Sequence, residues 1–233
     1  MESVTGLFEI HVFVEPLDPP DDRVAAFRAA CAGAPAPMKA LLLELDYVGK
    51  GFVGVLQSSR YIEGDTAAAR DAARADAEVL RAAGFTVIRE KVEALASDPG
   101  VPRDAADAAL SPADRYFEFH LLIDGKHGPL SEDDMRGLRA LSTEFAERLA
   151  RPVPLSYNAL KPAQRFLNLR APVVAREPGS RAHCGLIEAM KPVDELAAAI
   201  ASRELIVKKT IAEYICFDSN RAVDNGWLEP EGA

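Results

Sequence analysis

Apolar and polar positions alternate with strand periodicity in two similar stretches of the chain. Residues 8–14 read Phe-Glu-Ile-His-Val-Phe-Val, and residues 117–123 read Phe-Glu-Phe-His-Leu-Leu-Ile. Successive side chains of a strand point to opposite faces. Each stretch therefore predicts a strand that presents one glutamate and one histidine on the same face, and the pattern occurs once in each half of the chain.

The first half predicts the order strand, helix, strand, strand, helix, strand. The strands are expected at residues 7–15, 39–47, 52–62 and 85–92, and the helices at 21–31 and 66–83. Gly84 follows the second helix, as is common at helix C-termini. A polar segment rich in Asp, Ala and Pro comes next, at residues 97–114, and is expected to be a linker.

The second half predicts the same order. Strands are expected at residues 116–124, 154–160, 165–171 and 206–217, and helices at 131–149 and 193–204. Ser131 is a typical N-cap. Residues 172–184 are long for a compact connection and are typical of a lid or binding loop. A turn-rich tail starts at Asp218 and holds the only tryptophan, Trp227. The tail either docks onto the second unit or contributes to a partner surface, and Trp227 favours docking.

Two β-α-β-β-α-β units predict an α+β protein of tandem duplicated ferredoxin-like units with antiparallel sheets, each with two helices on one face. The first unit would cover residues 1–96, the linker 97–114, and the second unit with the C-terminal tail 115–233. The closing strands share the pattern I-x-E-x-(V/I) at residues 88–92 and 211–215. This fold serves many unrelated activities and does not name a function.

Composition excludes several classes of function. The 233 residues carry a formal charge of −9, which argues against nucleic acid or an anionic membrane as a partner. No apolar run is long enough to span a membrane, so a soluble, cytoplasmic protein is expected. The three cysteines are widely spaced and predict reduced thiols. Phosphate-binding glycine motifs are absent, so no nucleotide cofactor is expected.

The paired Glu and His residues are the first candidates for chemistry. Glu9 and His11 share the helix-free face of the first sheet, and Glu118 and His120 that of the second. These faces either stay in solvent or pack together, and packing would bring both pairs into one cleft. His11 and His120 would then bind a divalent metal ion of undetermined type, or serve with Glu9 and Glu118 as acids and bases. Alternatively, they are ordinary polar positions of solvated strands.

Two further glutamates, Glu90 and Glu213, lie on the closing strands, which neighbour the first strands in a ferredoxin-like sheet. The order His11, Glu90, His120, Glu213 is similar to the His-Glu-His-Glu metal set of vicinal-oxygen-chelate enzymes, although their modules lack the second helix. Structural salt bridges are the alternative role for both glutamates. The two-histidine phosphoesterases offer an analogy only, because the hydroxyl residue of their H-x-(T/S) motif is missing after both histidines.

Basic residues dominate between residues 148 and 181, in contrast to the acidic chain as a whole. Guanidinium groups bind carboxylate and phosphate with two hydrogen bonds. Arg165 and Arg170 on a hairpin, with Arg60 as a counterpart in the first half, are therefore predicted to hold a small anionic substrate. The alternative is that each arginine pairs with a surface acid of the protein.

These observations predict a soluble enzyme that acts on a small anionic substrate at a cleft between two pseudo-symmetric halves. Its chemistry would be metal-assisted or Glu/His acid–base catalysis, with hydrolase, isomerase and lyase reactions all open. The alternative is a non-catalytic ligand-binding or protein-interaction module with the same tandem fold. Pairs of ferredoxin-like units also associate through their sheet faces, so a homodimer stays open.

Overall fold

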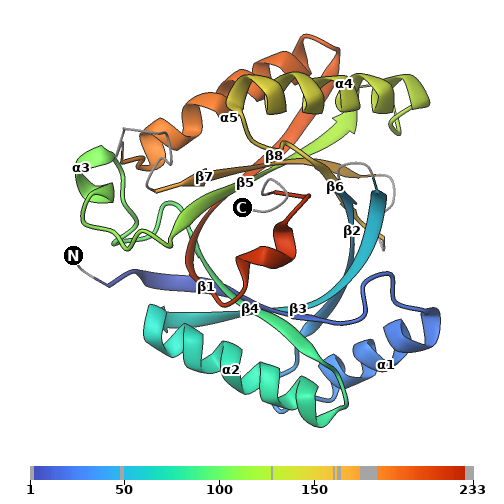
Figure 1. The fold of residues 1–233 in the computed structure, drawn as a ribbon, viewed down its shortest axis with the longest axis vertical. Helices are drawn as coiled ribbons and strands as arrows, with labels where there is room; N and C mark the ends of the chain where they lie inside the picture. The colour runs from blue at the N-terminus through green and yellow to red at the C-terminus, as the bar shows by residue number, and fades with distance from the viewer. Residues whose placement is uncertain are drawn as a thin grey trace.

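The strands of both halves form one closed antiparallel barrel in the computed structural model, which describes residues 3–47, 50–126, 128–159, 161, 164–173 and 183–228 (Figure 1). The prediction of an α+β fold with antiparallel strands is confirmed. The strands are β1 (Thr5–Val14), β2 (Lys39–Tyr47), β3 (Gly51–Asp65), β4 (Val87–Leu95), β5 (Tyr116–Gly125), β6 (Leu155–Asn158), β7 (Arg165–Pro172) and β8 (Leu205–Asp218).

The barrel order is β1-β3-β2-β6-β7-β5-β8-β4. Within each half the order is the same, β4-β1-β3-β2 in the first and β8-β5-β7-β6 in the second. The halves meet edge to edge, where β2 pairs with β6 and β4 pairs with β8. The two halves do not form separate sheets, because strand pairing between their edges closes both into one barrel. The helix-free faces line its interior.

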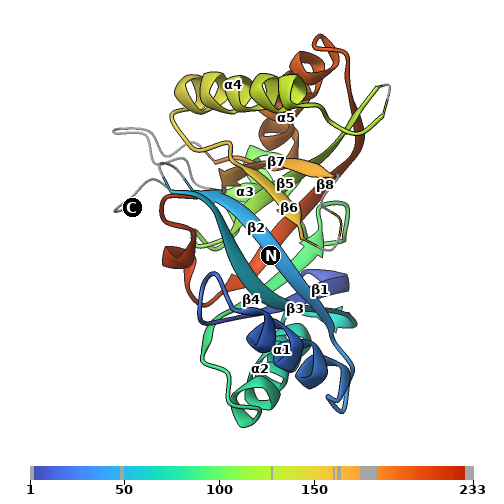
Figure 2. The ribbon, with the colours of Figure 1, turned by 90° about the vertical axis from the view of Figure 1, so that its right-hand side faces the viewer.

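Two helices cover the outer face of each half (Figures 1 and 2). In the first half these are α1 (Asp21–Ala32) and α2 (Thr66–Ala82), and in the second α4 (Glu132–Leu149) and α5 (Leu186–Ala201). Helix α4 buries Leu138, Leu141 and Phe145 at three- and four-residue spacing. Because the helices take the outer faces, alternate residues of every strand face the barrel interior.

Two elements differ from the sequence prediction. A single-turn helix, α3 (Ala105–Ala108), lies in the predicted linker, and its Asp104 side chain caps the backbone N–H groups of Ala106 and Asp107. Helix α5 starts at Leu186, before the predicted start at residue 193, and contains Pro192, which leaves one helical hydrogen bond unformed. Of the predicted irregular segment at 172–184, residues 174–182 lie outside the described residues.

The chain after β8 turns back across one end of the barrel (Figure 1). It forms a short 3-10 helix, η1 (Arg221–Asp224), and then buries Trp227 and Leu228 in one cluster with Phe13 and Leu45. The tail therefore docks, and Trp227 packs against strands of the first half, while Asp224 contacts Arg170 of the second half. Residues 229–233 lie outside the described structure. Within the described ranges, no helix combines the length and the apolar character that a membrane crossing requires.

The outward face of β5 is central to the core, since Phe119 is fully buried in a cluster that includes residues of α4 and α5. We expect Phe119→Ala to lower the free energy of unfolding by about 3–5 kcal/mol, because the lost ring leaves a cavity that neighbours fill only partly. The control Leu110→Ala, at a residue 68% exposed, should change it by less than about 0.5 kcal/mol. Chemical denaturation measures both, and equal losses would contradict this core assignment.

Candidate active site

The barrel interior encloses a cavity of about 300 Å³. Its apolar wall comes mainly from β2, through Leu41, Leu43 and Leu45. The polar wall comes from the strands that carry the repeated Glu-x-His pattern and from their neighbours. The polar residues facing the cavity include Glu9, His11, Lys91, Glu93, Glu118, His120, Asn168 and Glu213.

His11 on β1 is held between two acceptors and is 6% exposed. Its Nδ1 lies 3.0 Å from the carbonyl oxygen of Ser58, and its Nε2 lies 3.1 Å from Glu93 Oε2. A second carboxylate, that of Glu9, lies 3.8 Å from Nε2. Ser59 Oγ donates to Glu9 Oε1 at 2.5 Å and holds that carboxylate in place.

His120 on β5 has an equivalent environment in the second half. Its Nε2 lies 3.2 Å from Glu213 Oε2 and 3.8 Å from Glu118 Oε2. Its Nδ1 lies 2.7 Å from Asn168 Oδ1. Asn168 Nδ2 donates to Pro154 O and Ser156 Oγ, at 2.9 and 3.0 Å, so the Asn168 oxygen is left to accept from the imidazole.

These contacts define the protonation state of both histidines. A carbonyl and a carboxylate oxygen can only accept, so each imidazole donates from both nitrogens and is an imidazolium. Burial lowers the pKa of His11, but the charge and hydrogen bond of Glu93 outweigh this and raise it to about 8. Burial likewise lowers the pKa of His120, while Glu213 raises it to about 9. Both imidazoles are therefore protonated on both nitrogens and positively charged at neutral pH.

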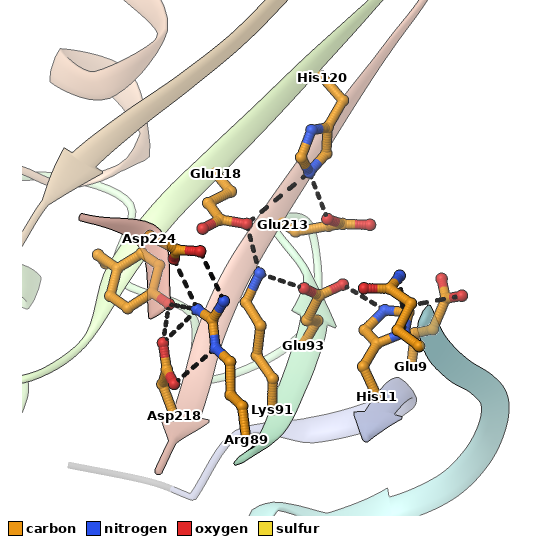
Figure 3. A network of polar contacts seen from close by, with 12 residues as sticks. Glu9, His11, Arg89, Lys91, Glu93, Glu118, His120, Glu213, Asp218 and Asp224 are labelled. Carbon is orange, nitrogen blue, oxygen red and sulfur yellow. Dashed lines mark hydrogen bonds and ion pairs between the residues drawn. The ribbon is translucent and has the colours of Figure 1, made fainter. Parts of the chain in front are cut away.

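Lys91 on β4 lies between the two histidine environments (Figure 3). Its Nζ is 2.6 Å from Glu93 Oε1 and also contacts Glu118 Oε2. Burial alone would lower the pKa of Lys91, but Glu118 and Glu93 raise it. Burial would raise the pKa values of both glutamates, and Lys91, the largest opposing influence on each, helps to lower them. All three groups are charged, and the Lys91 ammonium lies between the two carboxylates.

A second charged cluster closes the interior near the C-terminal tail (Figure 3). Asp224 of η1 accepts from Arg89 at 2.8 Å and contacts Arg170. Arg89 also donates to Asp218 at 2.6 Å, and Arg170 donates to Glu118 at 2.5 Å. These side chains are all at most a few per cent exposed. The tail is therefore tied by charge to the same network as the histidines.

The structure brings most of the predicted Glu and His residues to the cavity and leaves one out. Glu90 is on the outer face of β4, where its carboxylate lies 3.3 Å from Arg81 of α2. The prediction of Glu90 as a metal ligand is corrected, because Arg89, Lys91 and Glu93 are the alternate residues that face inward. Glu93, which pairs with Glu9 across β1 and β4, occupies the place that Glu213 has beside Glu118.

Of the predicted substrate-binding arginines, none is free inside the cavity. Arg60 points outward and binds Asp76 of α2 at 2.8 Å. Arg165 stacks on Tyr157 at 4.2 Å, on the outer face of the barrel. Arg170 faces inward but is bound to Glu118 and Asp224. Arg165 and Arg170 are an odd number of positions apart, so strand alternation places them on opposite faces.

Sequence reasoning missed Lys91, Glu93, Asn168 and Asp224. The alternation Arg89, Lys91, Glu93 was a usable signal for the first two, since these residues share one strand face. Asn168 shares the inward face of β7 with Arg170 by the same rule. Asp224 had no periodic signal, because it follows the last strand in an irregular tail.

A three-residue group could hold a metal ion. Glu9, His11 and Glu93 each offer one ligand atom, and these atoms lie within 4.8 Å of one another. This set differs from the predicted His11, Glu90, His120 and Glu213, because the two histidines contact different carboxylates. Metal binding here would require the Nε2 proton of His11 to leave, since a ligand nitrogen needs its lone pair.

Comparison with known proteins adds little. No protein family and no curated protein matches the chain. Among solved structures, one described as "Putative monooxygenase" from Fusobacterium nucleatum subsp. nucleatum ATCC 25586 has 10% identity and a TM-score of 0.34, with both chains fully covered. Another, a "putative monooxygenase" from Lactobacillus acidophilus NCFM, has 13% identity and a TM-score of 0.30, with 93% of this chain and 95% of that chain covered. Likeness at these scores carries no argument about chemistry.

The role of Glu213 can be tested by titrating the histidines. In wild type, NMR of the imidazole nitrogens should give pKa values of about 8 for His11 and about 9 for His120. We expect Glu213→Gln to lower the pKa of His120 by roughly 1–3 units, because the imidazolium loses its nearest anion. The matched variant Glu90→Gln, on the outer face, should leave it unchanged. A pKa of His120 that is indifferent to Glu213→Gln would refute this pairing.

Proposed function

We propose that the chain is an enzyme that transfers protons to and from a small molecule bound in the barrel cavity. The observation that carries this proposal is the pair of imidazolium groups, His11 buried and His120 half-buried, each in contact with a carboxylate, on the wall of one cavity of about 300 Å³. Cavities of this size hold small ligands. Histidine and glutamate with shifted pKa values are the usual groups for acid–base catalysis near neutral pH.

The second half is the better candidate for the reacting side. Glu213 lines the cavity, and within the described structure His120 is its one ion-pair partner. Burial raises the pKa of Glu213 while that of His120 is also raised, so a proton can be shared between them. Glu213 would deliver this proton to a substrate atom and recover it from His120. Isomerisation, elimination and hydrolysis all use such a step.

We further infer that the two halves arose by duplication of a ferredoxin-like unit. The strand order is the same in each half, and the register places Glu9 beside Glu93 as it places Glu118 beside Glu213. The symmetry is broken beside the histidines, where Lys91 pairs with His11 and Ile211 pairs with His120. Lys91 neutralises Glu93, whereas Glu213 forms no ion pair with a lysine in the described structure. This asymmetry supports the assignment of proton transfer to the second half.

A metal-dependent enzyme is the second candidate, supported by the spacing of Glu9, His11 and Glu93. One nitrogen and two carboxylate oxygens are a ligand set that suits several divalent metals, with further positions left for water or substrate. A bound ion would polarise a substrate oxygen or lower the pKa of a bound water. Lys91 disfavours metal binding at this position, because its ammonium group already forms an ion pair with the Glu93 carboxylate.

The proton-transfer proposal can be tested although its substrate is unidentified. Purified protein is incubated with a metabolite extract, and mass spectrometry follows which compounds are consumed. We expect wild type to consume some of these compounds. The control variant His183→Gln, which changes a histidine outside the cavity lining, should consume the same compounds. Glu213→Gln should convert them at least about a hundredfold more slowly, as expected for loss of an acid–base group. Equal conversion by Glu213→Gln would contradict the proposal, and no conversion by wild type would favour the non-catalytic binding module.

The metal alternative makes a prediction with a definite pH dependence. His11 must release a proton with a pKa of about 8 to bind an ion, so uptake of Zn²⁺ or Mn²⁺ should be greater at about pH 9 than at about pH 6.5. Elemental mass spectrometry should then give close to one ion per chain, with loss in the variant Glu9→Gln/His11→Gln and retention in Glu90→Gln. Absence of uptake at the higher pH would eliminate this alternative.

A further inference from the structure

The inward face of β2 forms a continuous stripe from the surface to the closed end of the barrel. Lys39, Leu41, Leu43 and Leu45 alternate along the strand and all line the cavity. Lys39 is exposed, Leu41 is 9% exposed and Leu45 is 3% exposed. The stripe therefore begins with a positive charge at the mouth and becomes apolar and enclosed with depth.

The deep end of this stripe is closed by aromatic side chains. Leu45 packs in one cluster with Phe13 and Trp227, both 7% exposed. Trp227 belongs to the tail that Asp224 ties to the barrel. At about 3.3 Å per residue, the strand from Lys39 to Leu45 is roughly 20 Å long. A ligand shorter than this can thus lie lengthwise along β2, between Lys39 at the mouth and Trp227 at the closed end.

Within the described part of the chain, the mouth carries two cations without an anionic partner. Lys39 and Lys161 both line the cavity and are both exposed, and within the described residues neither makes an ion pair. The other cavity-lining cations, Arg89, Lys91, His11 and His120, each lie within ion-pair distance of two carboxylates. A ligand anion would therefore be attracted to the mouth and not to the deeper interior.

We propose that the cavity binds an apolar carboxylate, with its anionic group at Lys39 and Lys161 and its apolar body along Leu41, Leu43 and Leu45 toward Trp227. A cavity of about 300 Å³ corresponds to on the order of ten waters of liquid volume, which suits a ligand of roughly ten non-hydrogen atoms. Glu213 and His120 line the opposite, polar wall. This assignment rests on the proposed function for its substrate class, while the binding itself does not depend on catalysis.

Trp227 makes the test direct, because it is the only tryptophan and it lines the cavity. Octanoate is titrated into full-length wild type while tryptophan fluorescence and calorimetry are followed. We expect a saturable fluorescence change with octanoate, at least about tenfold weaker binding of acetate, which lacks the apolar body, and no specific binding of octylamine, which carries the opposite charge.

The lysines are tested by charge reversal. Lys39→Glu/Lys161→Glu should weaken octanoate binding by about tenfold or more, because two attractions become repulsions. The control Lys126→Glu/Lys208→Glu makes the same change of net charge at exposed lysines outside the cavity lining, and should bind as wild type does. Circular dichroism checks that each variant is folded, as expected for substitutions at exposed residues.

Three outcomes would overturn the assignment: no saturable binding of octanoate by either method, binding of octylamine at least as tight, or equal weakening by the control variant. Failure of the proposed function is a separate result. If wild type and Glu213→Gln bind octanoate alike and neither converts any metabolite, the binding assignment stands and the catalytic proposal falls. If wild type converts metabolites but does not bind octanoate, the catalytic proposal stands and the binding assignment falls.

Discussion

The pairing of buried charges inside the barrel is the constraint on which the arrangement of the site depends. Charged groups removed from water are stable only when they meet opposite charges with good geometry. Lys91 meets this condition by contacting Glu93 from the first half and Glu118 from the second. The two halves are thus joined by charge across the interior as well as by backbone pairing at β4 and β8.

The C-terminal tail extends the same constraint. Asp224 is inserted between Arg89 and Arg170, and Arg170 also binds Glu118. Removal of one partner from a buried ion pair typically costs about 3–5 kcal/mol, so the tail, the closed end of the barrel and the polar wall of the cavity form one interdependent unit. With one end closed by this tail, a ligand would enter at the mouth near Lys39.

The functional interpretation follows from how many cations each carboxylate of the cavity wall contacts. Glu118 is saturated by Lys91 and Arg170 and is poorly suited to act as a base, although its position in the repeated motif suggested that role. Glu213 has only an imidazolium as its ion-pair partner in the described structure. In the proposed function the near-symmetric halves therefore have different roles, and the difference follows from Lys91 beside His11 and Ile211 beside His120.

Periodicity alone predicted the strands of the barrel, the helices that cover it, the α+β class and the shared strand face of Glu9 with His11 and of Glu118 with His120, because alternation is a local property of a strand. Alternation also places Arg165 and Arg170 on opposite faces of their strand, and likewise Glu90 and Glu93. Only the tertiary structure decided that the sheets close edge to edge, that Lys91 lies between the histidines, and that Asp224 enters the barrel. These depend on contacts between residues far apart in sequence, which pattern and composition do not encode.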